Sequence, residues 1–307
     1  MSKNSSGRAA WRNVSGIVLF DKPAGLSSNQ ALQKVRWLFR ADKGGHTGSL
    51  DPLATGLLPI CFGEATKIAG LLLGSRKAYE TECLLGVTTT TEDAEGEIVL
   101  TRDVPAIDDV RIEAELARLT GRITQIPPIY SALKQAGVPL YKRARRGEDV
   151  TAPAREVDVH RFRLLERAGD RLRLQVECGS GTYVRSLVRD LGEQLGCGAH
   201  VTALRRLWVE PFRTPLMITL EALEELAAAG PSALDRHLIP LEDGLAGYPQ
   251  VVIDALQVQR LRQGQMIESA DAPPGRCVAI DDEGRAIALV EYAAEGRLRP
   301  LRGFNPT

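Results

Sequence analysis

The spacing of apolar residues along the chain follows two different periods, and each period predicts a different kind of element. Apolar and polar residues alternate over residues 77–86 and 171–176, and residues 16–20 form a short apolar run, so these segments are predicted to be strands. Apolar residues recur every three or four positions over residues 32–39 and 112–119, which predicts helices. The chain is therefore expected to combine strands and helices.

Capping residues mark where two of the helices begin. Ser27 and Gln30 have the spacing of a capping box before the first helix. Later in the chain a predicted strand runs into a glycine turn, after which Thr182 is predicted to cap a helix over residues 183–195. Arg185 is therefore expected in the first turn of a helix that begins directly after a strand.

Other segments have little regular period. Residues 44–59 are rich in glycine and proline and are predicted to form a stiff loop around one acid, Asp51. Residues 64–74 resemble a helix with a glycine stop. Residues 125–150 are predicted to be an extended, partly mobile surface element, and four of residues 141–146 are basic.

The two ends of the chain differ from the part between them. Residues 1–13 are polar and are predicted to be a flexible N-terminus, and residues 14–246 form the main predicted domain. Residues 247–307 have one short predicted helix, residues 253–262, and a hairpin pattern around residues 282–284. This C-terminal part is predicted to be a small, β-rich module.

Composition and charge exclude few classes of protein. Lysine plus arginine and aspartate plus glutamate number 39 each, so net charge indicates no partner. The five cysteines form no CxxC pair, which argues against a zinc ribbon or a disulfide framework. The chain begins without a signal-peptide pattern, and its longest apolar patch, residues 68–74, is too short to cross a bilayer. A cytoplasmic protein without membrane contact is expected.

Asp51 is the first candidate catalytic residue, and the residues around it leave two interpretations open. An aspartate before a proline is a common turn residue. Alternatively, a carboxylate held stiffly in a loop with free backbone around it suits a nucleophile or a general base. Burial would neutralise such a carboxylate unless a cation lay beside it, and Arg185 is the candidate cation.

Cofactor and metal motifs are missing from the sequence. The Gly-Lys-Ser/Thr of a phosphate loop and the dinucleotide fingerprint do not occur, and the four histidines lie far apart without a HExxH pair, so neither a nucleotide site nor a metal site is predicted. His46 is of interest as a planar group near Asp51. Tyr79 and Tyr183 are either core residues or stacking platforms, and residues 141–146 are either a solvated loop or a clamp for a polyanion.

Six blocks of sequence together resemble one family. They are DKPAGLSS, GGHTGSLDPLATGLLPICFGEATK, KAYE, PPIYSALK, GTYVRSLVRDLG and HVTALRR, in this order. The chain is thereby similar to bacterial tRNA pseudouridine synthases of the TruB family, which act on uridine 55 in the T loop. The resemblance implies an α+β fold with a mixed, largely antiparallel central sheet flanked by helices. It also implies a C-terminal RNA-binding module of the PUA type and an RNA-clamping role for residues 125–150.

The resemblance also implies roles for single residues. Asp51 matches the catalytic aspartate, Tyr79 the tyrosine that stacks on uracil, and Arg185 the arginine that pairs with the carboxylate. The positions that the family uses to hold RNA and the flipped base are matched by His46, Tyr183 and Leu204. Lys22, with Pro23, matches a block that supports the cleft, and Lys67 is a candidate RNA contact.

The implied reaction is the isomerisation of uridine 55 to pseudouridine by base flipping. It needs no cofactor, and the expected partner is the T stem-loop of tRNA, bound by a monomer that requires no protein partner. Two other interpretations remain. An RNA-binding or tRNA-folding protein without catalysis would not need Asp51, and a glycosidase-like hydrolase would need a second carboxylate.

Overall fold

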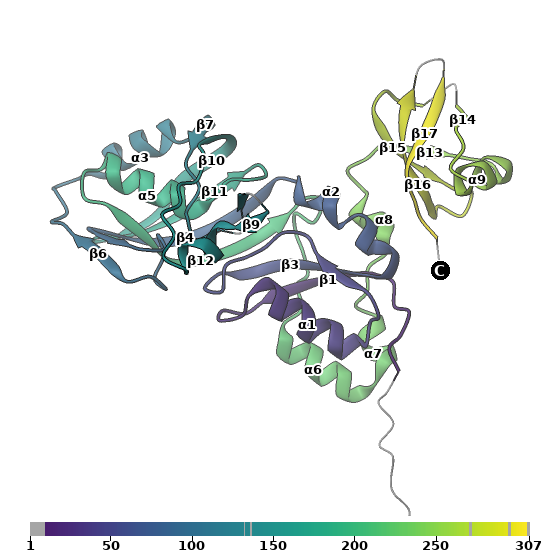
Figure 1. The fold of residues 1–307 in the computed structure, drawn as a ribbon, viewed down its shortest axis with the longest axis horizontal. Coiled ribbons are helices and arrows are strands. Elements are labelled where there is room, and N and C mark those ends of the chain that lie inside the picture. Colours follow the sequence, from purple (N-terminus) through teal and green to yellow (C-terminus); the bar gives the residue numbers. More distant parts are fainter. Residues whose placement is uncertain (1–9, 132, 136, 270–271, 294–295, 306–307) are drawn as a thin grey trace, which may run out of the picture.

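The computed structural model describes residues 10–131, 133–135, 137–269, 272–293 and 296–305. Within these residues the main feature is a mixed sheet of eight strands, seven of them in the order β1-β3-β12-β4-β11-β10-β7, with β2 paired to β3 (Figure 1). The strands of this sheet are β1 (Gly16–Lys22), β2 (Gly44–His46), β3 (Thr55–Phe62), β4 (Lys77–Leu85), β7 (Gly121–Gln125), β10 (Arg155–Ala168), β11 (Arg171–Cys178) and β12 (Ala199–Val209). All these neighbours are antiparallel except β3 and β12, whose short pairing is parallel.

Helices cover the sheet at two places. Near β1 and β3 lie α1, α6 and α7, whereas α3 and α5 lie beside β10, β11 and β12 (Figure 1). The helices of this part of the chain are α1 (Ser28–Phe39), α2 (Ala69–Leu73), α3 (Asp109–Arg118), α4 (Leu140–Ala144), α5 (Val184–Gln194), α6 (Leu220–Ala229), α7 (Pro231–Asp235) and α8 (Leu241–Gly244). The predicted α+β fold with a largely antiparallel mixed sheet is confirmed.

The beginning of α1 follows the sequence pattern closely. The Ser27 side chain accepts from the Gln30 amide while the Gln30 side chain accepts from the Ser27 amide, so the predicted capping box is present. Leu32, Val35 and Phe39 are buried on one face of the helix. The periodic apolar face is what joins α1 to the sheet.

The prediction of one continuous loop over residues 44–59 is wrong. Residues 44–46 form β2, and from Thr55 the chain is already the interior strand β3, which pairs with both β1 and β12. A strand that is covered on both faces reads as an unbroken apolar run, so β3 shows no alternation in the sequence. The loop proper covers only residues 47–54.

The predicted helix over residues 64–74 is divided. A 3-10 helix η1 (Gly63–Lys67) precedes the short α2. The Thr66 hydroxyl donates to the carbonyl of Gly63 at 2.7 Å, a local bond that competes with regular α-helical geometry.

Two further segments contain short elements of their own. Residues 87–101 form the hairpin of β5 (Val87–Thr89) and β6 (Ile98–Thr101). In residues 125–150 the described part includes the small hairpin of β8 (Lys134–Gln135) and β9 (Val138–Pro139), followed by α4. This insertion has more regular structure than its sequence predicts.

The C-terminal part is β-rich, as predicted. Its described residues form a five-stranded sheet in the order β13-β15-β16-β17-β14, with α9 (Ala255–Arg262) beside it (Figure 1). The strands are β13 (Gln250–Val252), β14 (Ile267–Glu268), β15 (Arg276–Ile280), β16 (Ala286–Ala293) and β17 (Arg297–Gly303). Phe304 packs in a core with Ile17 and Ile68, so this module is attached to the main sheet by buried apolar side chains. The predicted boundary at residue 247 stays a prediction.

The described residues include only part of the predicted flexible N-terminus, residues 1–13. Residues 1–9 of the predicted flexible N-terminus lie outside the described residues. Arg12 contacts the Asp235 carboxylate, and the Arg36 guanidinium lies 4.7 Å from the centre of the Trp11 ring, so residues 11 and 12 are held against the body. Among the described helices, none is long and apolar enough to span a membrane.

Gly56 is the position where β3 and β12 approach most closely, and it generates a test. Its φ is +95°, and an added Cβ would overlap the carbonyl oxygen of Arg206. Gly56→Ala is therefore expected to lower the free energy of unfolding by about 3 kcal/mol or more, measured by urea denaturation. The matched control is Gly25→Ala, where φ is +82° and nothing lies within 4 Å of the new Cβ, so only about 1 kcal/mol is expected. Equal losses in both variants would show that the close approach is relaxed in solution.

Candidate active site

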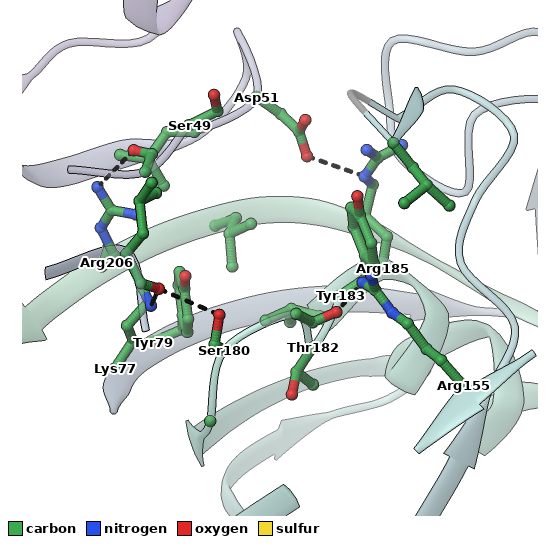
Figure 2. Close-up of a pocket in the computed structure, with 18 residues that line it drawn as sticks. Ser49, Asp51, Lys77, Tyr79, Arg155, Ser180, Thr182, Tyr183, Arg185 and Arg206 are labelled. Carbon is green, nitrogen blue, oxygen red and sulfur yellow. Dashed lines mark hydrogen bonds and ion pairs between the residues drawn. The ribbon is translucent and has the colours of Figure 1, made fainter. Parts of the chain in front are cut away.

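A cavity of about 360 Å³ lies where the loop before β3 faces the turn before α5. Figure 2 shows Asp51 and Arg185 on one side of it and Lys77, Tyr79 and Arg206 on the other. The lining residues are Gly48, Ser49, Leu50, Asp51, Leu73, Lys77, Tyr79, Leu133, Arg155, Gly179, Ser180, Gly181, Thr182, Tyr183, Val184, Arg185, Leu204 and Arg206. Strands β4 and β12 form its floor, so residues more than 150 positions apart in the chain share one pocket.

The loop that carries Asp51 is tied to its surroundings by backbone hydrogen bonds. The Ser28 hydroxyl accepts from the Leu50 amide at 2.7 Å, and the Pro52 carbonyl accepts from the Gly25 amide at 2.8 Å. Lys22, which is fully buried, also donates to the Pro52 carbonyl, at 3.3 Å. The carboxylate is therefore presented by a rigid backbone, as the proline and glycine content of the loop indicates.

Arg185 is the cation beside Asp51. Its Nε lies 2.9 Å from Oδ2 of Asp51, and its side chain is only 3% exposed. The two terminal nitrogens donate to backbone carbonyls of Thr91 at 2.7 Å and Tyr130 at 3.0 Å. Asp93, also buried, has its Oδ2 3.6 Å from Nη1 of Arg185. The predicted pair is thus brought together, and the guanidinium is oriented by four residues from three segments of the chain.

Burial and charge act in opposite directions on Asp51. Burial raises the pKa of the Asp51 carboxyl above its ordinary value, while Arg185 and then Lys22 lower it and Asp93 adds to the increase. The net direction is upward. Because 35% of the Asp51 side chain is still exposed, solvent and a ligand in the pocket can reach the carboxyl. A carboxylate of this kind can act as a nucleophile or a base once it is ionised.

Three other predicted residues line the same pocket. Tyr79 lies on β4 and is almost fully buried, and burial raises the pKa of its phenol. Leu204 lies on β12. Tyr183 precedes α5, and the Arg155 guanidinium lies 4.9 Å from the centre of its ring. An apolar and aromatic wall therefore stands beside the carboxylate, which suits a planar ligand.

The prediction that Thr182 caps α5 is wrong. The helix begins at Val184, with Tyr183 at the N-cap and no capping side chain. Gln125, which lies on β7 and is fully buried, holds the N-cap residue itself. Its Oε1 accepts from the Tyr183 amide at 2.8 Å, and its Nε2 donates to the Tyr183 carbonyl at 3.1 Å. A tertiary contact thus fixes the residue at which α5 begins, in place of the local cap that the sequence suggests.

Three predicted residues do not line the pocket. Lys22 lies behind the Asp51 loop, where burial lowers its pKa to about 8. His46 is half-buried on β2, and burial and Arg206 lower its pKa. Lys67 donates to the Glu64 carboxylate at 2.6 Å and to the Gly303 carbonyl at 3.0 Å, at the contact between η1 and the C-terminal part. The roles in RNA binding assigned to His46 and Lys67 stay predictions.

Four residues of the site were not identified from the sequence. Asp93 and Gln125 orient the α5 end, and Lys77 and Arg206 line the pocket floor. Lys77 and Arg206 lie in the blocks KAYE and HVTALRR. A charged residue on the apolar face of a strand is the sequence feature that could have indicated them. In the part of the chain that the structure describes, no group of three or more histidine, cysteine, aspartate or glutamate residues is placed to hold a metal ion.

Solved structures define the class of fold. The chain is similar to a chain in the crystal structure of a Cbf5-Nop10-Gar1 complex, with a TM-score of 0.73 and 23% identity, covering 95% of this chain and 85% of that chain. It is also similar to a chain in the structure of an H/ACA RNP bound to a substrate RNA, with a TM-score of 0.72 and 21% identity, covering 95% and 85%. The fold is that of the pseudouridine synthases, with a C-terminal module consistent with the PUA type.

Sequence comparison then defines the family. Residues 36–184 match the model of the TruB family pseudouridylate synthase N-terminal domain, and residues 185–246 match the tRNA pseudouridylate synthase B C-terminal domain. The chain is 58% identical to a tRNA pseudouridine synthase B of Xanthomonas campestris pv. campestris, covering 97% of this chain and 96% of the relative. It is 53% identical to that of Pseudomonas putida, covering 95% and 96%. The chain belongs to the TruB family of pseudouridylate synthases, which are isomerases, so the predicted family and enzyme class are confirmed.

The position of Arg185 predicts how Asp51 titrates. In the ¹³C NMR spectrum of the free protein, the Asp51 carboxyl is expected to titrate above the ordinary value of about 3.9. Since Arg185 favours the charged form, Arg185→Ala is expected to raise the pKa of Asp51 further.

The matched control for this titration is Arg189→Ala, one turn along α5. Arg189 pairs with Glu92 and Asp190 and does not contact Asp51. The control variant should leave the pKa of Asp51 unchanged. A pKa of Asp51 that stays the same in both variants would disprove the electrostatic coupling of Asp51 to Arg185.

Proposed function

We propose that this enzyme converts uridine 55 in the T loop of tRNA to pseudouridine, with Asp51 as the catalytic carboxylate and no cofactor. The observation that carries the proposal is the placement of one carboxylate, Asp51, 2.9 Å from a buried guanidinium at the wall of a pocket that Tyr79 also lines. The relatives named tRNA pseudouridine synthase B support the choice of tRNA as substrate.

The reaction requires that one base leave the stack of the RNA loop. Uracil enters the pocket, where it stacks on Tyr79 with Tyr183 and Leu204 beside it. Unstacking costs a few kcal/mol, and stacking on an aromatic side chain returns about 1–3 kcal/mol per base. The glycosidic bond between C1′ and N1 then breaks, the uracil turns, and a bond forms between C1′ and C5.

Asp51 is the group that acts on the sugar or the base. An ionised carboxylate can attack a carbon atom or accept a proton from the sugar, and Arg185 keeps it available for this in a partly buried site. Among the described residues that line the pocket, Asp51 is the one carboxylate. A glycosidase-like hydrolase uses two carboxylates that flank the bond, so this lining favours isomerisation over hydrolysis.

Residues 125–150 are proposed to clamp the RNA. The beginning of this segment contacts α5, the helix that carries Arg185. The Ile126 carbonyl accepts from the Ser186 hydroxyl and from Arg189, both at 3.0 Å. Together with the contact of Tyr130 to Arg185, these bonds connect the insertion to α5. RNA bound on the insertion is thereby connected to the guanidinium that orients Asp51.

The remaining parts of the proposal concern the whole molecule. Residues 14–246 act as the catalytic domain and residues 247–307 as a PUA-like RNA-binding module. Lys67, which donates to the Gly303 carbonyl beside the junction of these two parts, is proposed to contact RNA outside the pocket. We place the protein in the cytoplasm as a monomer that binds the T stem-loop without a protein partner.

The first test removes the carboxylate charge. Asp51→Asn is expected to lower the rate of pseudouridine formation in a tRNA transcript by at least about 1000-fold, because the amide is neither a nucleophile nor a base. The affinity for the transcript should stay within about threefold, measured by filter binding. The control Asp42→Asn changes an exposed aspartate outside the pocket and should have no effect.

The same variant tests the position in tRNA. Cells that lack this protein should lose pseudouridine at position 55, and the wild-type gene but not Asp51→Asn should restore it. Normal modification by Asp51→Asn would refute the assigned role of the carboxylate, and loss at another position would refute the choice of uridine 55.

The second test concerns the clamp. Replacing Lys142 and Arg145 of the basic cluster, residues 141–146, with alanine should weaken binding and reduce the slope of log K against log salt by about 1.4–1.8, for two phosphate contacts. Lys34→Ala, on the outer face of α1, is the control and should leave the slope unchanged. An unaltered slope in the double variant would remove the insertion from the RNA interface.

A further inference from the structure

The floor of the pocket contains two buried cations that the proposed reaction has not used. Lys77 is 8% exposed and Arg206 is 0% exposed, and both line the pocket. Within the described residues, neither Lys77 nor Arg206 has a charged nitrogen within 4 Å of a carboxylate oxygen, in contrast to Arg185. Two charges are therefore buried side by side without a counter-charge in contact.

Backbone carbonyls are the partners of both groups. Lys77 donates to the carbonyls of Leu73 at 2.9 Å and Ser75 at 2.8 Å. Arg206 donates from Nε to the carbonyl of Leu57 at 2.6 Å and from Nη2 to that of Gly48 at 3.3 Å. Neutral carbonyls compensate only part of the cost of removing a charge from water. Neutral donors could make the same hydrogen bonds to these carbonyls, so a purely structural role would not by itself require the charges of Lys77 and Arg206.

The two cations converge on the same part of the pocket wall. A Cβ added to Gly48 would lie 3.8 Å from Nη1 of Arg206 and 4.0 Å from Cε of Lys77. The Arg206 guanidinium also opposes the rise in the pKa of the Tyr79 phenol that burial causes, so this cation lies near the proposed stacking platform. Figure 2 shows Lys77, Tyr79 and Arg206 together, across the pocket from Asp51. Asp51 thus acts from one side of a bound nucleoside, and positive charge stands on the other side.

One donor of Lys77 is left for a ligand. An ammonium group carries three N–H donors, and two of them bind the carbonyls of Leu73 and Ser75. The Ser180 hydroxyl donates to the same Leu73 carbonyl at 3.1 Å, so this oxygen already has two donors. Among the described residues the third donor of Lys77 has no hydrogen-bond partner, so it is available to the pocket that Lys77 lines.

We propose that Lys77 and Arg206 are catalytic residues that stabilise the negative charge on uracil after it separates from the ribose. This inference rests on the proposed function. When the bond between C1′ and N1 breaks, its electron pair stays on uracil and C1′ is left electron-deficient, and the negative charge spreads from N1 to O2 and O4. A π electron pair of the ring then forms the bond from C5 to C1′, the proton on C5 leaves, and N1 gains a proton. Atoms and electrons balance without an external reagent.

A charge that exists only during the reaction has a specific kinetic consequence. Preorganised cations that meet a developing charge lower the barrier and need not strengthen binding of the ground state. A phosphate of the RNA backbone is charged at all times, so a cation that bound phosphate would contribute to affinity instead. A variant that loses rate but keeps its affinity for RNA therefore indicates a uracil anion. A variant that loses rate and affinity equally indicates a backbone phosphate.

The experiment compares Lys77→Met with Lys77→Arg in single-turnover reactions on a tRNA transcript. Lys77→Met should reduce the rate about 100-fold or more, with the dissociation constant within about threefold of wild type. Lys77→Arg should recover at least about tenfold of this loss, because it restores a cation. Lys34→Met, an exposed lysine outside the pocket, is the matched control and should react like wild type.

The pH dependence provides a measurement that a purely structural role would not affect. Burial and then Arg206 lower the pKa of Lys77 to about 8, against the opposing effects of Cys178 and Glu210. Its charge is lost as the pH rises through that value, so the wild-type rate should decline above about pH 8. In Lys77→Arg the decline should weaken, because guanidinium stays charged. Lys22, whose pKa is also about 8, is present in both proteins and does not alter this difference.

Three results would overturn the proposal. They are an unchanged rate in Lys77→Met, a loss of affinity equal to its loss of rate, or the same alkaline decline in wild type and Lys77→Arg. If Lys77→Met fails to fold, as judged by its near-UV circular dichroism, the pH profile of Lys77→Arg still decides. Failure of the proposed function has a separate signature, because the wild-type protein would then form no pseudouridine at position 55.

Discussion

An ion pair between a partly exposed carboxylate and a buried guanidinium is the interaction on which the rest of this site depends. Asp51 lies in the loop before β3, and Arg185 lies more than 130 residues later, in the first turn of α5. The two meet because β12 joins β3 to β4 in one sheet, so that both loops open at the same edge. The close parallel contact at Gly56 is the point where this connection is made.

Opposing electrostatic effects give the pocket its chemical character. Burial favours the neutral form of Asp51, and Arg185 restores part of the preference for the charged form. Across the cavity, Lys77 and Arg206 are buried with backbone carbonyls as partners. A pocket with a carboxylate on one side and positive charge on the other is suited to separating charge in a bound nucleoside.

The contacts of α5 connect residues 125–150 to the pair of Asp51 and Arg185. Gln125 holds both backbone groups of Tyr183, and Tyr130 accepts a hydrogen bond from Arg185. Both belong to the segment that carries the basic cluster, residues 141–146. Residues 125–150, which the sequence predicts to be an extended surface element, thus help to hold Arg185 and the beginning of α5. A change in this insertion therefore also changes the surroundings of Arg185.

Features that depend on neighbours in the chain were determined by the sequence itself. The capping box of α1, the alternation in β4 and β11, and the turn from β11 into α5 are local patterns, and the structure contains all three. The six sequence blocks likewise indicated the family and the group of Asp51, Tyr79 and Arg185, because motif residues keep their spacing in the chain. These three side chains do line one pocket.

Features that depend on contacts between distant segments were decided only by the tertiary structure. The strand β3 is hidden in an apolar run because both of its faces are covered, and Gln125 on β7 holds the N-cap residue Tyr183, whereas Thr182 does not cap the helix. Lys67 proved to contact Gly303, and Lys77 and Arg206 proved to face the pocket. Burial, electrostatics and hydrogen-bond partners are properties of the folded surroundings, and a linear pattern does not contain them.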